Sequence, residues 1–250
     1  MSFCDKCIAG VRHEGTPSGK VEEINGVKTY VAIPEKEFPK DKAIIFCSDI
    51  FGLDLPNNLL LADDFAKNGF QVYIPDYLNG DPVPGDFLGG KFDLNKWFPT
   101  HTAEFTRPPL DKVIASLKEK GVTTFGAIGY CYGARYVFDL AFDRVIKAAV
   151  VNHPTFIEAP KDHEEYKAKA AGIPLLINSC ETDSQYPAEK QEIGDKVLGG
   201  GTMKGEGYER LYWPGCEHGF SVRGDMSKPE VKAGKEGAFK AAVEWFIKYL

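Results

Sequence analysis

The sequence predicts an α/β protein with a mostly parallel sheet of about seven to eight strands and helices on both faces. Short apolar runs alternate with amphipathic helical patterns along the chain, and this alternation is typical of parallel sheets wrapped by helices. The runs at 43–48 and 146–152 are apolar almost throughout, as expected for strands buried on both faces. The 250 residues contain no linker and no internal repeat, so we expect a single domain over residues 1–250.

Each element follows from its local pattern. Residues that favour strands gather in seven short runs, at 29–33, 43–48, 71–75, 123–129, 146–152, 174–179 and 208–213. Apolar residues recur every three or four positions in six predicted helices, at 58–68, 110–120, 131–142, about 162–171, after Pro187, and from about 229 to 249. The segment 76–109 is rich in glycine and proline. It is predicted to be a long loop that forms a lid or pocket wall, with a peripheral excursion as the alternative.

Composition and charge narrow the classes of function. The chain has 30 Lys and Arg against 36 Asp and Glu, a formal net charge of −6, which argues against binding a nucleic-acid backbone. No stretch approaches the roughly 20 apolar residues of a membrane span, so we expect no membrane partner. The first residues lack the basic start and apolar run of a signal peptide. We therefore expect a cytoplasmic protein with reduced thiols.

The strongest signal for chemistry lies between a predicted strand and a predicted helix. Residues 129–133 read Gly-Tyr-Cys-Tyr-Gly, the pattern of a nucleophile elbow with cysteine in place of serine. Glycines are needed there because the nucleophile takes a strained backbone and a nearby Cβ would collide with the neighbouring strand or helix. The first N–H groups of the helix favour a thiolate at Cys131. The alternative is a buried structural cysteine in a glycine-flanked turn.

A cysteine nucleophile needs a base and a group that orients the base. His218 is the main candidate base because it follows the last predicted strand, and ligands bind beyond the carboxyl ends of parallel strands. Asp183 follows the preceding strand and is the candidate acid, with Glu181 as its rival. The order Cys131, Asp183, His218 is the order of α/β-hydrolases. His153 also follows a strand directly and is a further candidate for the pocket.

The reaction would need two preorganised N–H donors for an oxyanion. Tyr132, directly after the nucleophile, is expected to provide one, and Ile50, after the strand at 43–48, the other. Several aromatic residues near these motifs are expected either to line a pocket or to fill the core. They are Phe51, Trp97, Tyr132, Tyr186 and Phe220.

Together these motifs resemble the dienelactone hydrolase family of α/β-hydrolases. The resemblance rests on residues 49–52 (Asp-Ile-Phe-Gly), the elbow, Asp183 and residues 218–220 (His-Gly-Phe), and it covers nearly the whole chain. The stretches at 15–19 and 220–225 are most similar to a fungal subgroup of that family. The resemblance implies an α/β-hydrolase fold and a hydrolase that cleaves a lactone or carboxylic ester through a Cys-His-Asp triad and a thioester, with no cofactor and no metal ion.

Two departures from the family's bacterial members concern the nucleophile and the substrate. Those members carry a glutamate that interacts with the resting thiol, and the resemblance places Asp49, one methylene shorter, at that position near the nucleophile. They also hold the substrate carboxylate with two arginines. Arg223 can match one of these, although it lies five residues after His218 rather than four. The other is expected soon after Asp76, where residues 77–80 contain no arginine. We therefore expect a less charged or larger ester than dienelactone.

Other interpretations remain open. One is a non-catalytic α/β-hydrolase scaffold that binds a small molecule or senses redox state. Another is a glutamine-amidotransferase-like hydrolase that uses His163 and Glu165, although His163 is expected to be solvated at the start of a charged helix. Cys4 and Cys7 have the spacing of half a zinc site or of a redox pair, but no second pair follows. The expected partner is a small-molecule ester or lactone, bound by a monomer or homodimer.

Overall fold

The computed structural model of the protein describes residues 11–85 and 92–250. Its strands are β1 (Lys20–Ile24), β2 (Val27–Ala32), β3 (Lys42–Cys47), β4 (Gln71–Pro75), β5 (Thr124–Tyr130), β6 (Ala148–Asn152), β7 (Leu175–Thr182), β8 (Lys204–Gly205) and β9 (Tyr208–Glu217). Its α-helices are α1 (Pro56–Lys67), α2 (Leu94–Trp97), α3 (Ala103–Glu119), α4 (Gly133–Phe142), α5 (Lys161–Lys169), α6 (Ala188–Leu198), α7 (Phe220–Arg223) and α8 (Pro229–Tyr249).

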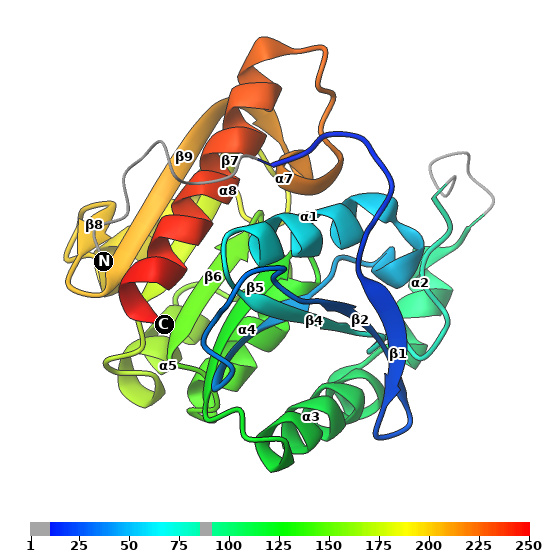
Figure 1. The fold of residues 1–250 in the computed structure, drawn as a ribbon. Coiled ribbons are helices and arrows are strands. Elements are labelled where there is room, and N and C mark those ends of the chain that lie inside the picture. The colour runs from blue at the N-terminus through cyan, green and yellow to red at the C-terminus, as the bar shows by residue number, and fades with distance from the viewer. Residues whose placement is uncertain (1–10, 86–91) are drawn as a thin grey trace.

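The strands form one sheet in the order β1-β2-β4-β3-β5-β6-β7-β9-β8 (Figure 1). The six strands from β4 to β9 in that order are parallel to one another. Strands β1 and β2 on one side and β8 on the other are antiparallel to their neighbours. The predicted α/β class with a mostly parallel sheet is therefore confirmed.

The nine strands in the described residues exceed the predicted seven to eight, and the two additional ones lie at the edges of the sheet. Strand β1 exposes the side chains of its first four residues, so it lacks the apolar run that marks a strand in the sequence. Strand β8 has only two residues and carries no periodic signal. Edge strands of this kind are defined by backbone pairing with a neighbour, which a local pattern does not encode.

Helices cover both faces of the sheet (Figure 1). Helices α1 and α8 bury one face, where the ring of Phe65 packs on those of Phe239 and Phe246 with centroid separations of 4.7 and 6.1 Å. Helices α3, α4, α5 and α6 bury the other face, where Phe138 of α4 meets Tyr166 of α5 at 5.2 Å. Among the described residues no helix is long and apolar enough to cross a membrane.

The predicted long loop at 76–109 is partly helical, which corrects the prediction. Helix α2 and a short 3₁₀ helix (Phe98–Thr100) lie within it, and α3 begins at Ala103 and continues through Pro108 and Pro109. A proline inside a helix removes one N–H donor and is usually unfavourable, so the pair of prolines reads as a helix boundary in the sequence. Here the buried face of α3 outweighs that cost. Residues 86–91 of this segment lie outside the described residues.

Candidate active site

The chain turns sharply at Cys131, between β5 and α4. Cys131 has a positive φ of 52°, which is uncommon for a residue with a side chain. A Cβ on Gly133 would stand 2.1 Å from the carbonyl oxygen of Cys47, and one on Gly129 would stand 2.6 Å from that of Gly133. Both flanking positions therefore require glycine, and the local geometry is that of a nucleophile elbow. Helix α4 begins two residues later than predicted, because Cys131 and Tyr132 form the turn itself.

Asp183 and His218 follow the neighbouring strands β7 and β9, and their side chains meet. The Nδ1 atom of His218 lies 2.9 Å from Oδ1 of Asp183. The same carboxylate oxygen accepts the backbone N–H groups of Gln185 and Tyr186 at 2.8 and 3.1 Å. These bonds fix the carboxylate, which in turn fixes the orientation of the imidazole. The rival acid Glu181 is exposed and accepts the N–H of Gly215 instead.

The imidazole of His218 also faces the sulfur of Cys131. Burial lowers the pKa of His218, but hydrogen bonds to Asp183 and Cys131 and the charges of both partners outweigh burial and raise the pKa to about 9. Three side chains that are distant in the sequence thus meet beyond the carboxyl ends of β5, β7 and β9. Such an arrangement can move a proton between sulfur and imidazole while the carboxylate stabilises the cation.

A fourth group, which the sequence analysis missed, contacts the sulfur. The hydroxyl of Thr155 lies 3.4 Å from the sulfur of Cys131, and the N–H of Thr155 donates to the carbonyl oxygen of Cys131 at 3.1 Å. Thr155 is buried in the turn after β6. Functional groups tend to follow parallel strands, and this rule points to the turn after β6. Within that turn it favours His153, which stands nearer to the strand, over Thr155.

His153 lies behind His218 rather than at an open surface. It is fully buried, its Nε2 lies 2.8 Å from the hydroxyl oxygen of Ser221, and its ring meets that of His218 edge to face at 5.0 Å. Burial, together with the charges of His218 and Arg223, lowers the pKa of His153 well below its usual value. His153 is therefore a neutral group that supports the ring of His218, and the structure does not place it where a substrate would touch it.

The two predicted oxyanion donors flank the elbow. Tyr132 follows Cys131 directly, and Ile50 follows β3, the strand whose Cys47 pairs with Gly129 of β5. The carbonyl oxygen of Ile50 accepts a hydrogen bond from the N–H of Val83 at 2.8 Å, which holds the loop after β3 in place. Within residues 11–85 and 92–250, no hydrogen-bond acceptor is assigned to the backbone N–H of either Ile50 or Tyr132.

Asp49 is fully buried and forms an ion pair with Arg223 rather than a hydrogen bond with the thiol. Its Oδ1 accepts from the amide of Asn58 at 2.9 Å and from the N–H of Phe51 at 3.2 Å, and its Oδ2 lies 3.7 Å from a guanidinium nitrogen of Arg223. Burial raises the pKa of Asp49 against these interactions. The guanidinium also covers the ring of Phe51, 5.0 Å from its centroid. Arg223 therefore lies between Asp49 and Phe51, while its side chain stays 31% exposed.

All five predicted pocket aromatics are buried, and they differ in how near they lie to the elbow. Trp97 donates its indole N–H to the carbonyl oxygen of Asp81 at 2.8 Å and packs against Tyr132 at 5.8 Å, close to the elbow. Phe220 is buried among core residues of α8 and β9. Tyr186 is buried as well, and its hydroxyl lies 2.8 Å from His163. Neither Phe220 nor Tyr186 lies open to a substrate, so both are core residues.

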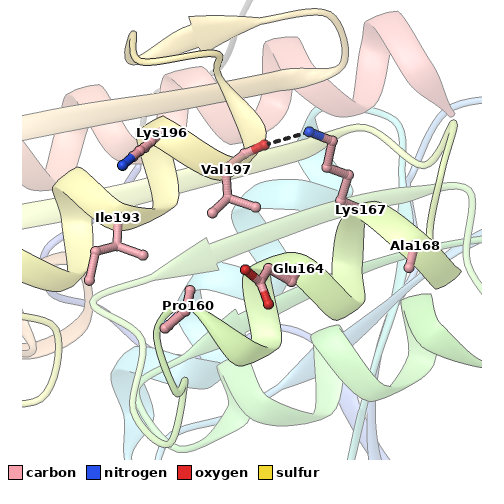
Figure 2. A pocket seen from close by; sticks show the side chains of 7 residues that line it. All are labelled: Pro160, Glu164, Lys167, Ala168, Ile193, Lys196 and Val197. Carbon is pink, nitrogen blue, oxygen red and sulfur yellow. Dashed lines mark hydrogen bonds between the residues drawn. The ribbon is translucent and has the colours of Figure 1, made fainter.

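Two further observations concern sites outside the elbow. His163 is fully buried between α5 and α6, so the prediction that it is solvated was wrong. The outer surfaces of these two helices form a groove lined by Glu164 and Lys167 of α5 and by Ile193 and Val197 of α6 (Figure 2). The amine of Lys167 donates to the carbonyl oxygen of Val197 at 3.3 Å across that groove. This groove shares no residue with the elbow.

In the described part of the chain no group of three or more His, Cys, Asp or Glu side chains could hold a metal ion. Cys4 and Cys7, which have the spacing of half a zinc site, lie outside the described residues. Cys47, Cys180 and Cys216 are free and buried, as expected for small apolar side chains.

Comparison with known proteins establishes the family. The sequence profile of the Dienelactone hydrolase family matches residues 27–250. The chain belongs to the dienelactone hydrolase family. The resemblance predicted from the motifs is thereby confirmed, and so is the enzyme class of an ester or lactone hydrolase. Membership of this family favours a hydrolase over a non-catalytic scaffold.

Fungal members of the dienelactone hydrolase family are among the relatives. Hydrolase pyvD of Aspergillus violaceofuscus is 35% identical over 98% of this chain and 96% of its own length. Hydrolase tropI of Talaromyces stipitatus is 31% identical over 98% of this chain and 95% of its own length. Dienlactone hydrolase 1 of Gibberella moniliformis is 31% identical over 96% of this chain and 91% of its own length.

Solved structures share the fold of this dienelactone hydrolase family member. A putative dienelactone hydrolase from Klebsiella pneumoniae matches with a TM-score of 0.69 at 20% identity, over 89% of this chain and 93% of that one. A soluble variant of the monoglyceride lipase of Saccharomyces cerevisiae matches with a TM-score of 0.60 at 12% identity, over 94% and 96% of the two chains. The α/β-hydrolase fold is confirmed.

Proposed function

We propose that the protein hydrolyses a lactone or carboxylic ester in two steps, through a thioester formed on Cys131. The observation that carries the proposal is the position of His218. Its Nδ1 lies 2.9 Å from Asp183, and Cys131 lies close enough to the same ring to raise its pKa. An imidazole held between a thiol and a carboxylate can accept the thiol proton while the carboxylate stabilises the resulting cation.

In the first step the sulfur attacks the carbonyl carbon of the substrate. His218 holds the proton that it has taken from Cys131, so the sulfur attacks as a thiolate, the new S–C bond forms, and the carbonyl π electrons move to the oxygen. The N–H groups of Ile50 and Tyr132 donate to that oxyanion. When the carbonyl re-forms, the C–O bond to the alcohol breaks. The alkoxide takes the proton from His218 and leaves as the alcohol, or, in a lactone, stays attached as a hydroxyl.

In the second step water releases the acid. His218 takes a proton from a water molecule as its oxygen attacks the thioester carbonyl, and the same two N–H groups receive the negative charge. The C–S bond then breaks, the sulfur leaves as a thiolate, and His218 keeps the proton taken from water, which restores the pair of thiolate and imidazolium. Sulfur is a good leaving group because the thiolate is stabilised by the imidazolium and by the first turn of α4.

A pair of matched acid variants tests the roles of the carboxylates. Asp183→Asn is expected to lower kcat by at least about a hundredfold, because the amide neither stabilises the imidazolium nor fixes the required tautomer. Glu181→Gln is the control, since Glu181 is exposed and bonds to Gly215 instead of His218. Its kcat on the same p-nitrophenyl ester is expected to stay within about twofold of wild type.

The thioester itself is tested at the nucleophile. Cys131→Ala is expected to lose turnover of lactones and p-nitrophenyl esters while keeping the circular dichroism and urea midpoint of the wild type. Acid quenching of wild type during turnover, followed by mass spectrometry, should show the acyl group on the peptide that contains Cys131. Full activity in Cys131→Ala would overturn the proposal.

A further inference from the structure

Two phenylalanines, neither of them expected from the sequence, stand beside the elbow. The ring of Phe98 meets that of Phe156 edge to face, with centroids 5.3 Å apart and planes at 88°. Both rings also contact Tyr132, at 6.4 and 5.8 Å. Phe98 comes from the segment after α2 and Phe156 from the turn after β6, so two distant parts of the chain build one aromatic surface. We call Phe98, Phe156 and Tyr132 the aromatic wall.

Phe156 is held in this position at a cost. It has a positive φ of 59°, which is unfavourable for a residue with a bulky side chain. Its side chain is 46% exposed, so core burial does not offset that strain. A strained backbone that presents an apolar ring to solvent is typical of a functional position.

Two residues connect the aromatic wall to the reacting sulfur. Thr155, the residue before Phe156, places its hydroxyl 3.4 Å from the sulfur of Cys131. Tyr132, the residue after Cys131, belongs to the wall and supplies one of the proposed oxyanion donors. A carbonyl carbon bonded to the sulfur would therefore carry its substituents past this surface.

The cation that contacts the wall is already paired within the protein. Arg223 faces the buried carboxylate of Asp49 at 3.7 Å and covers Phe51. Arg135, whose guanidinium donates to the carbonyl oxygen of Phe156 at 3.5 Å, forms ion pairs with Asp139 and Asp162 at 2.6 and 2.7 Å. Arg135, the guanidinium that contacts Phe156, is therefore not left to neutralise a substrate carboxylate beside the wall, so a charged group there would lose hydration without gaining a partner.

We infer that the aromatic wall selects uncharged substrates with a planar, aromatic ring fused to the lactone or otherwise close to the scissile carbonyl. The inference rests on the proposed function and names its class of substrate. Phe98 and Phe156 stand edge to face. A substrate ring that packs against them adds contacts of the edge-to-face kind that aromatic rings prefer. A saturated ring of the same size contacts the same surface but lacks this edge-to-face attraction.

Fused lactones test the inference, because acyl and alcohol parts share one ring system. The first probe is isochroman-3-one, in which a benzene ring is fused to the lactone. The second is its cyclohexane-fused analogue, and the third carries an added ring carboxylate. Initial rates of acid release give kcat/KM, which we expect to favour the aromatic lactone over the saturated one by about threefold to tenfold. The carboxylated probe is expected to be the poorest of the three.

Variants attribute this preference to the wall. Phe156→Leu, and separately Phe98→Leu, should bring the aromatic-to-saturated ratio of kcat/KM close to one. Phe105→Leu is the matched control, since Phe105 is 52% exposed on α3 and lies outside the wall. This control should keep the wild-type ratio. Because two wall variants are measured, the test still holds if one of them fails to fold.

A binding measurement separates failure of this inference from failure of the proposed function. Cys131→Ala is titrated with the same three lactones by calorimetry, and we expect the same order of affinity without turnover. If wild type cleaves none of them but the order of binding holds, the proposed hydrolysis fails and the wall is supported. If the aromatic and saturated lactones are cleaved and bound equally, or the carboxylated one is preferred, the inference is overturned and the hydrolase proposal stands.

Discussion

The hydroxyl of Thr155 lies 3.4 Å from the sulfur of Cys131, although 24 positions separate the two residues in the sequence. The contact exists because β6 lies beside β5 in the sheet, so the turn after β6 reaches the elbow after β5. A hydroxyl at this distance can donate to the sulfur when it becomes a thiolate, which stabilises the charged form.

Removing that hydroxyl should slow the reactions of the thiol. Thr155→Val keeps the shape of the side chain and deletes the donor, and we expect the rate of alkylation of Cys131 by iodoacetamide at pH 7 to fall by about threefold to tenfold, the equivalent of one hydrogen bond. Thr155→Ser retains the donor and should react at nearly the wild-type rate. Equal rates for the valine variant and wild type would mean that the contact has no role in reactivity.

The ionisation of His218 should make stability depend on pH. Asp183 and Cys131 raise its pKa to about 9 in the folded protein, above the roughly 6.5 of an unfolded chain. Protonation of His218 therefore stabilises the fold fully below about pH 6.5, and this contribution is lost as the pH rises through about 9. In urea unfolding, the free energy of unfolding of wild type should exceed that of His218→Gln at pH 6.5. This difference should shrink by roughly 1–3 kcal/mol between pH 6.5 and pH 9.

A variant that removes no ionisable group separates this effect from general titration of the protein. Ser227→Ala, at an exposed position, should show the same loss of stability between pH 6.5 and pH 9 as the wild type. If the difference in free energy of unfolding between wild type and His218→Gln stays constant with pH, the assigned protonation of His218 is contradicted.

The buried pair of His153 and Ser221 should act through the position of His218. Ser221→Ala removes the partner at 2.8 Å from His153 and should lower the free energy of unfolding by about 1 kcal/mol. Because the ring of His153 supports that of His218, kcat should fall severalfold with little change in KM. Ser227→Ala is the surface control and should leave both quantities near wild type. A rise in KM at constant kcat would instead indicate a role in binding substrate.

The elbow should not tolerate a side chain at Gly133. In Gly133→Ala the new Cβ would meet the backbone oxygens of Cys47 and Ser48 at 2.1 and 2.5 Å, so α4 must move away from β3. We expect a loss of more than about 2 kcal/mol in the free energy of unfolding, together with loss of turnover. Gly85→Ala, whose Cβ meets nothing within 4 Å, should unfold at nearly the wild-type urea concentration. Similar midpoints for both variants would disprove the steric argument.

Much of the central sheet could be predicted from the sequence, because its strands are buried and apolar on both faces. The run at 43–48 has no polar alternation, and β3 indeed lies in the middle of the sheet. The segment at 103–109 was misassigned because Pro108 and Pro109 read as a break, although packing of α3 against the sheet retains them inside the helix.

The chain order of cysteine, acid and histidine and the two elbow glycines are properties of the sequence alone, because the turn after a parallel strand has local chemical requirements. Which groups surround them was decided only by the tertiary structure. Thr155, the ion pair between Asp49 and Arg223, the support of His218 by His153, and the pairing of Phe98 with Phe156 all join segments that are distant along the chain. Such contacts depend on the order in which strands lie side by side, and no local pattern of residues records that order.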